Sequence, residues 1–112
     1  MMRENAVQRD IFAYLGSQPW CRLFRNNVGV FRTLDGERVV RVGLCEGSSD
    51  LVGLLAPHGR FLAIEAKRPG EKTKKHQEDF LAMVRMMGGL AFSARSLDEA
   101  KQRLAEEGYP NA

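Results

Sequence analysis

Residues 60–67, with the sequence RFLAIEAK, form the stretch that decides the fold. An apolar run of this length that ends in charged residues is typical of a buried strand. Side chains alternate between the two faces of a strand, so Glu65 and Lys67 share one face with Phe61 and Ala63. Burial of a charge is costly unless the charge is paired or bound to a metal. The acid and the ammonium group therefore either form an ion pair at the sheet margin or belong to a binding site.

Asp50 favours the second interpretation. It opens another apolar run, residues 50–56, and only Pro57, His58 and Gly59 separate this run from the first. A short turn of this kind predicts a hairpin, which would bring Asp50 to the same end of the sheet as Glu65. Two carboxylates are hard oxygen ligands that suit Mg²⁺ or Mn²⁺, and the backbone carbonyl of Ala66 could be a further ligand. The alternative for Asp50 is a turn-capping role after Gly-Ser-Ser.

The remaining patterns predict one α/β domain over residues 1–112, with a mixed sheet flanked by helices. Apolar residues recur at helical spacing in residues 3–15 and in residues 73–88, and Asp35-Gly36 is a tight-turn signal. The predicted elements are a helix over 3–15, a hairpin of 30–34 and 37–42, a loop over 43–49, a helix over 73–88, a strand over 90–94, and a last helix that begins at Ser96 or Asp98 and ends at Glu107.

Two polar residues occupy positions on apolar helix stripes. Gln77 precedes Phe80 by three residues on the predicted second helix, and Glu4 precedes Val7 by three on the first. Residues at this spacing lie on one face of a helix, so both side chains are expected to point toward the sheet. The alternative for each is a solvated terminal turn. A common polar site would explain both at once.

Basic residues gather in two parts of the chain. The net charge of +3 is weak grounds for a nucleic-acid partner, but the clustering of cations suits a polyanion. The alternative is a solvated charged face. One cluster, in residues 67–75, has Glu71 as its only acid and consists of Lys67, Arg68, Lys72, Lys74 and Lys75; the other consists of Arg22, Arg25, Arg32, Arg38 and Arg41.

Other sequence features indicate a soluble protein of the cytoplasm. Cys21 and Cys45 do not form a CxxC pair, so reduced, inert thiols are expected. The N-terminus has no apolar leader segment, and no stretch approaches the ~20 apolar residues of a membrane span.

In this setting the ordered motifs resemble those of the PD-(D/E)xK nuclease superfamily, and more narrowly the VRR-NUC (virus-type replication–repair nuclease) family. The resemblance covers roughly residues 3–94 and rests on Glu4, on the Gly-Ser-Ser-Asp-Leu segment of residues 47–51, on Glu65-Ala66-Lys67 and on Gln77, in that order. One departure is Ser49, where the superfamily motif has proline. The resemblance implies a restriction-endonuclease-like αβββαβ core. It also implies a Mg²⁺ site, with Mn²⁺ as a substitute, held by Glu4, Asp50, Glu65 and Ala66, and a catalytic set of Asp50, Glu65, Lys67 and Gln77.

The same resemblance implies a function. The chain is similar to stand-alone family members that act as homodimers on branched DNA, like Holliday-junction resolvases. We therefore expect a metal-dependent DNA endonuclease whose basic segment at 68–75 contacts phosphates. Three alternatives stay open: a nicking or restriction-like nuclease on linear duplex, a nucleic-acid-binding module without activity, and a domain that uses Met83, Met86, Met87 and Trp20 for protein contacts.

Overall fold

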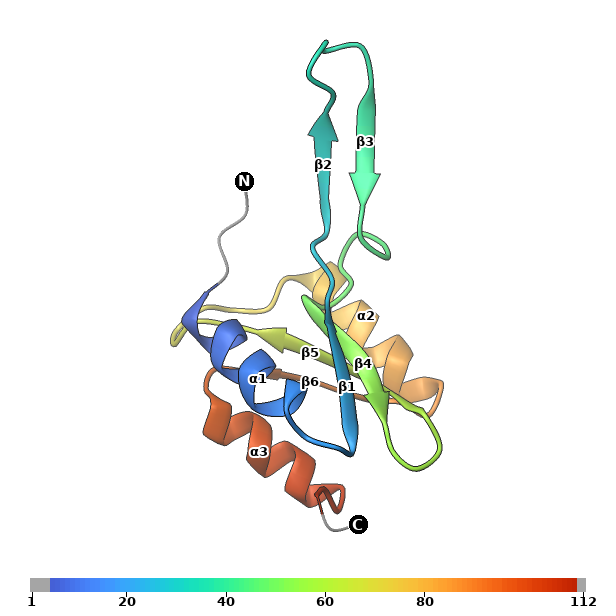
Figure 1. The fold of residues 1–112 in the computed structure, drawn as a ribbon. Helices are drawn as coiled ribbons and strands as arrows, with labels where there is room; N and C mark the ends of the chain where they lie inside the picture. Colours follow the sequence, from blue (N-terminus) through green and yellow to red (C-terminus); the bar gives the residue numbers. More distant parts are fainter. Residues whose placement is uncertain (1–4, 111–112) are drawn as a thin grey trace.

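The chain folds around a four-stranded mixed sheet, and our computed structural model describes residues 5–110 (Figure 1). The strands are β1 (Cys21–Arg25), β4 (Leu51–Leu55), β5 (Arg60–Ala66) and β6 (Leu90–Ala94), in the order β1-β4-β5-β6. β1, β4 and β5 are antiparallel neighbours, whereas β6 runs parallel to β5. The crossover between β5 and β6 contains a helix, which is the usual form of a parallel connection.

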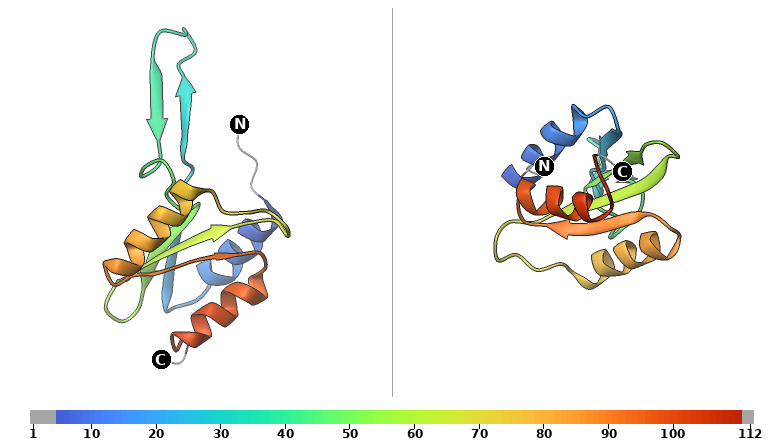
Figure 2. Two further views of the ribbon diagram at one scale, coloured as in Figure 1. Left: turned by 180° about the vertical axis from the view of Figure 1, so that it is seen from behind. Right: turned by 90° about the horizontal axis from the view of Figure 1, so that it is seen from below.

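Helices cover both faces of the sheet, as the views in Figure 2 show. α1 (Ala6–Gly16) and α3 (Leu97–Glu106) pack on one face, where Ile11 and Leu104 join a cluster with Leu62 and Phe92. α2 (Lys75–Met86) packs on the other face, where Phe80, Leu81 and Val84 contact Val52, Ala63 and Ala91. The two clusters alternate along β5, so the predicted division of its side chains between two faces is confirmed.

The predicted α/β class is confirmed. The segments α1, β1, β4, β5, α2 and β6 give the αβββαβ order, and α3 follows. β6 has the predicted bounds of 90–94. Of the two candidate caps for the last helix, Ser96 is the one that serves, since its hydroxyl accepts a hydrogen bond from the N–H of Glu99.

Two predicted helices were too long. α1 begins at Ala6 rather than at residue 3, because the side chain of Asn5 accepts a hydrogen bond from the N–H of Gln8 and so caps the first turn. α2 begins at Lys75 rather than at residue 73, and it ends at Met86. Its start is stabilised by Gln77, whose side-chain oxygen accepts a 2.9 Å hydrogen bond from the N–H of Lys74.

The predicted hairpin around Asp35 and Gly36 is confirmed, but it does not extend the central sheet. β2 (Gly29–Arg32) and β3 (Val39–Val42) pair only with each other and project from the body as a two-stranded ribbon (Figure 1). Both strands are shorter than predicted. The chain leaves the sheet at Asn26, whose side chain bonds to Ser48 and Ser49. Within residues 5–110, no helix combines the length and apolarity needed to cross a membrane.

Candidate catalytic and metal site

The site lies at the end of β5, where a buried strand carries two charges. Glu65 is the penultimate residue of β5, and the N–H of Lys67 donates a 2.9 Å hydrogen bond to the carbonyl of Ala94, which continues the ladder with β6. Glu65 is only 5% exposed and Lys67 only 4%. Both belong to the face of β5 that α2 covers, so helix side chains lie over them.

Asp50 reaches the same place from the neighbouring strand. It directly precedes β4, and the register that pairs Leu51 with Ile64 brings Asp50 opposite Glu65. Its Oδ1 atom accepts a 3.0 Å hydrogen bond from the N–H of Ala66. The structure therefore brings Asp50 and Glu65 together across the β4–β5 pair.

A glycine allows the turn before Asp50 to approach α2. Gly47 has a φ of 86°, a backbone conformation that favours glycine. A Cβ atom at this position would lie 2.5 Å from the carbonyl oxygen of His76, the residue before Gln77. A side chain would therefore push the turn away from the start of the helix.

Gln77 connects the helix to both charged residues of β5. Its Oε1 atom accepts a 2.8 Å hydrogen bond from Nζ of Lys67, and its Nε2 atom donates a 3.3 Å hydrogen bond to Oε1 of Glu65. The ammonium and carboxylate groups are themselves 3.9 Å apart. Gln77 is thus placed inward, as its position on the apolar stripe of α2 predicts, and it holds Lys67 beside Glu65.

The carboxyl groups of Asp50 and Glu65 both have raised pKa values. Burial, followed by the nearby charge of Asp50, raises the pKa of Glu65 to about 8. Burial also raises the pKa of Asp50 to about 6. Oε2 of Glu65 is buried and has no hydrogen-bond partner within the described part of the chain. Two mutually repelling carboxylates and an unpartnered buried oxygen fit a hard divalent cation.

The other two predicted metal ligands are the carbonyl of Ala66 and the side chain of Glu4. The carbonyl of Ala66 accepts a 3.1 Å hydrogen bond from Nδ2 of Asn5, so one side of this oxygen is already engaged. Glu4 lies outside the described residues. Across residues 5–110, no group of three or more His, Cys, Asp or Glu side chains is arranged to hold a metal. The described chain therefore offers Asp50 and Glu65 as the carboxylate ligands.

Two residues reach the site although the sequence patterns gave neither a role. Oε2 of Glu71 lies 3.8 Å from Nζ of Lys67, and Asn5 contacts Ala66 as described above. Glu71 also accepts a hydrogen bond from the N–H of Arg68, which shapes the loop between β5 and α2. The only sequence signal for Glu71 is that it is the one acid in a basic run.

The predicted DNA-contacting cations lie beside this site. Arg68, Lys72, Lys74 and Lys75 are all exposed in the β5–α2 loop or at the start of α2. Lys75 forms a 3.0 Å ion pair with Asp79, which offsets part of its charge. The other three are exposed cations in the segment that directly follows Lys67 in the chain.

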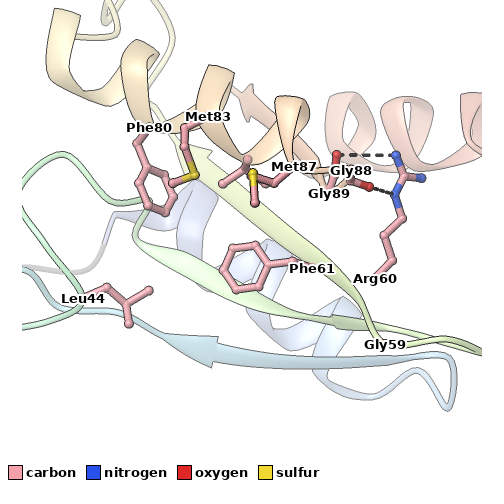
Figure 3. Close-up of a pocket in the computed structure, with 10 residues that line it drawn as sticks. Leu44, Gly59, Arg60, Phe61, Phe80, Met83, Met87, Gly88 and Gly89 are labelled. Atoms are coloured by element: carbon pink, nitrogen blue, oxygen red, sulfur yellow. Dashed lines mark hydrogen bonds between the residues drawn. The ribbon is translucent and has the colours of Figure 1, made fainter.

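A separate apolar groove of about 410 Å³ lies between α2 and β5 (Figure 3). Leu44, Phe61, Phe80, Met83 and Met87 line it, and none of the predicted catalytic or metal-binding residues within 5–110 does. Phe61 shares its face of the sheet with Phe24 and Leu54, and all three are at least 36% exposed. α2 therefore leaves part of this face uncovered.

Comparison with known proteins agrees with the fold. The model of the VRR-NUC domain matches residues 8–98, which include Asp50, Glu65, Lys67 and Gln77. No curated protein matches the chain. The match indicates a nuclease-type hydrolase that acts on DNA. Because the matched residues make up most of the chain, this protein belongs to the VRR-NUC family.

Proposed function

We propose that the protein is a divalent-metal-dependent endonuclease that hydrolyses phosphodiester bonds in branched DNA. The observation that carries the proposal is the buried pair Asp50–Glu65, with an unpartnered carboxylate oxygen, next to the ammonium group of Lys67. A purely structural ion pair would need one acid for one cation. Here the second buried acid raises the cost of ionising the first, and a divalent ion would remove that cost.

The metal would be Mg²⁺, with Mn²⁺ as a substitute, held by the carboxylates of Asp50 and Glu65. The carbonyl of Ala66 and the carboxylate of Glu4 would be additional ligands. Support for Ala66 is that its N–H already orients Asp50, so its carbonyl belongs to the same short segment. When bound, the ion would supply Lewis-acid polarisation of a phosphate oxygen.

The side chains around the metal would act on the phosphate. Lys67 would place its ammonium group against the negative charge that develops on the phosphate during hydrolysis. Gln77 would hold Nζ of Lys67 and Oε1 of Glu65 in fixed relative positions through its two hydrogen bonds. Arg68, Lys72, Lys74 and Lys75 would contact neighbouring phosphates, which positions DNA without reading its sequence.

Branched DNA and a homodimer belong together in this proposal. Resolution of a four-way junction needs two cuts in strands related by symmetry, and a two-fold homodimer would present two sites in that arrangement. The uncovered sheet face with Phe24, Leu54 and Phe61 offers an apolar surface for a second copy. Light scattering coupled to size exclusion tests the dimer, and an exclusively monomeric protein at assay concentration would count against it. The two free thiols, Cys21 and Cys45, suit the proposed cytoplasmic location.

The direct test is a cleavage assay with matched linear, flap and four-way DNA in Mg²⁺, in Mn²⁺ and in EDTA. We expect metal-dependent cleavage that favours the four-way junction, and no cleavage by the Asp50→Ala variant. Equal cleavage of all three substrates would replace branched-DNA selectivity with a general or nicking activity. Binding without cleavage in any metal would instead identify a nucleic-acid-binding module.

A further inference from the structure

The β2–β3 ribbon is a projecting element that the proposed chemistry does not use. A lone two-stranded ribbon gains little from its own packing and is usually stabilised by contact with something else. The views in Figures 1 and 2 show it extending away from the sheet and helices. Its side chains Val30, Phe31, Val39 and Val40 are all more than 40% exposed. Such a ribbon suggests a binding partner.

The two faces of the ribbon differ in chemistry. The register pairs Val30 with Arg41 and Arg32 with Val39, so these four residues share one face, here called the arginine face. Phe31, Val40 and Val42 lie on the opposite face. The arginine face therefore carries two cations on a short stretch of strand.

These cations have few partners of their own. Arg32 donates a 3.0 Å hydrogen bond to the carbonyl of Gly36, a neutral group in the turn. Arg41 forms no side-chain hydrogen bond or ion pair with any residue between 5 and 110. Between residues 5 and 110, neither acid of the turn, Asp35 or Glu37, forms an ion pair with these arginines, and the carboxylate of Asp35 accepts hydrogen bonds from the hydroxyl of Thr33 and the N–H of Glu37. The charge of the arginine face is thus available to a polyanion.

The base of the ribbon is fixed beside the acid pair. The N–H of Asn26 donates a 2.8 Å hydrogen bond to the carbonyl of Asp50, and its buried side chain bonds to Ser48, Ser49 and the N–H of Leu44. Asp35 in the turn lies six positions after Gly29, which at ~3.3 Å per residue gives an arm of roughly 20 Å. Duplex DNA rises ~3.4 Å per base pair, so the arm spans about six base pairs from the site.

We propose that the β2–β3 ribbon is a DNA-binding arm whose arginine face, through Arg32 and Arg41, contacts phosphates of the duplex on one side of the cleaved bond. The inference rests on the proposed function and extends it to a second contact region. A two-stranded ribbon fits the major groove, and arginine suits phosphate through its paired N–H donors. The arm would orient the duplex relative to Asp50 and Glu65.

The test compares two charge-matched variants. Arg32→Gln/Arg41→Gln removes two cations from the arginine face, and Lys101→Gln/Arg103→Gln removes two cations from α3. Binding of a four-way junction is measured by fluorescence anisotropy in EDTA over a series of salt concentrations.

Each lost phosphate contact lowers the slope of log K against log salt by ~0.9, so we expect a decrease of about 1.8 for the ribbon variant. The affinity at 0.15 M salt should fall on the order of tenfold. The α3 variant should keep the wild-type slope.

The outcomes separate this inference from the proposed function. A wild-type slope and affinity for Arg32→Gln/Arg41→Gln, in a protein that cleaves DNA, would overturn the arm alone. A changed oligomeric state of that variant without a changed slope would assign the arginine face to a second copy and also overturn it. A reduced slope in a protein that cuts no DNA would support the arm and reject the nuclease. Absence of DNA binding by the wild type would reject both.

Discussion

The side-chain oxygen of Gln77 accepts a 2.8 Å hydrogen bond from the ammonium group of Lys67, so a residue of α2 fixes the position of a residue at the end of β5. The same amide donates to Glu65. One helix residue thus orients both charged groups of the strand.

Replacement of Gln77 by alanine should slow cleavage by about 10- to 100-fold, because residues that orient the groups around a metal typically have effects of this size. The loss should appear in kcat, since the exposed lysines that would bind DNA are unchanged. Initial rates at saturating Mg²⁺ and DNA measure it. Gln102→Ala, the same substitution on α3, is the control, and equal rates for the two variants would contradict the orienting role.

Lys67→Met should reduce cleavage by at least 100-fold while the protein still folds and binds DNA. Methionine keeps most of the buried aliphatic volume but removes the charge that would stabilise the phosphate. Anisotropy in EDTA checks DNA binding, and circular dichroism checks the fold. Retention of full activity in Mg²⁺ would exclude Lys67 from the reaction.

The metal-free protein should lose stability as the pH rises. Burial raises the pKa of Glu65 to about 8 and that of Asp50 to about 6, whereas both carboxyls ionise near pH 4 in the unfolded chain. Between about pH 4 and pH 8 the folded protein therefore binds more protons than the unfolded chain, so the free energy of unfolding falls across this window, by a few kcal/mol. Denaturation in EDTA at several pH values measures this.

Two variants separate this effect from other titrating groups. Glu65→Gln should flatten most of the pH dependence, whereas Glu78→Gln, an exposed position on α2, should leave it unchanged. At pH 8, Mg²⁺ should raise the Tm of the wild type and of Glu78→Gln but not that of Glu65→Gln. A wild-type protein whose stability does not change between pH 5 and pH 8 would show that the fold does not raise the pKa values of Asp50 and Glu65.

Strand alternation and one short turn made much of the site predictable. The alternation in residues 60–67 and a short turn after residues 50–56 place Asp50 and Glu65 at the same end of the β4–β5 pair. The turn is one residue longer than predicted, since Leu55 pairs with Arg60, and this register brings Asp50 opposite Glu65. Gln77 could be placed because helical spacing ties it to Phe80. The contacts of Glu71 and Asn5 could not, since they depend on the path of the β5–α2 loop and on a helix cap.

The departure of the ribbon from the sheet was not predictable either. The apolar pattern of residues 22–42 is compatible with strands inside the central sheet, and only hydrogen bonds distant in sequence end β1 at Arg25. Asn26 makes these bonds with a side chain that suits a simple turn equally well. Side-chain contacts across some 20 residues leave no periodic signal in the sequence.

Asn26 should therefore matter for both stability and activity. Asn26→Ala removes partners from the N–H of Leu44, the hydroxyl of Ser48 and the carbonyl of Ser49, and it should lower the free energy of unfolding by roughly 2–4 kcal/mol. Because these bonds hold the turn that carries Asp50, the midpoint of Mg²⁺ activation should also shift to higher concentration.

Asn27→Ala changes an exposed neighbour and is the matched control. If both variants unfold at the same denaturant concentration, the side chain of Asn26 does not anchor the ribbon base. If Asn26→Ala loses stability but keeps the wild-type Mg²⁺ dependence, the anchor acts on the fold and leaves the position of Asp50 unchanged.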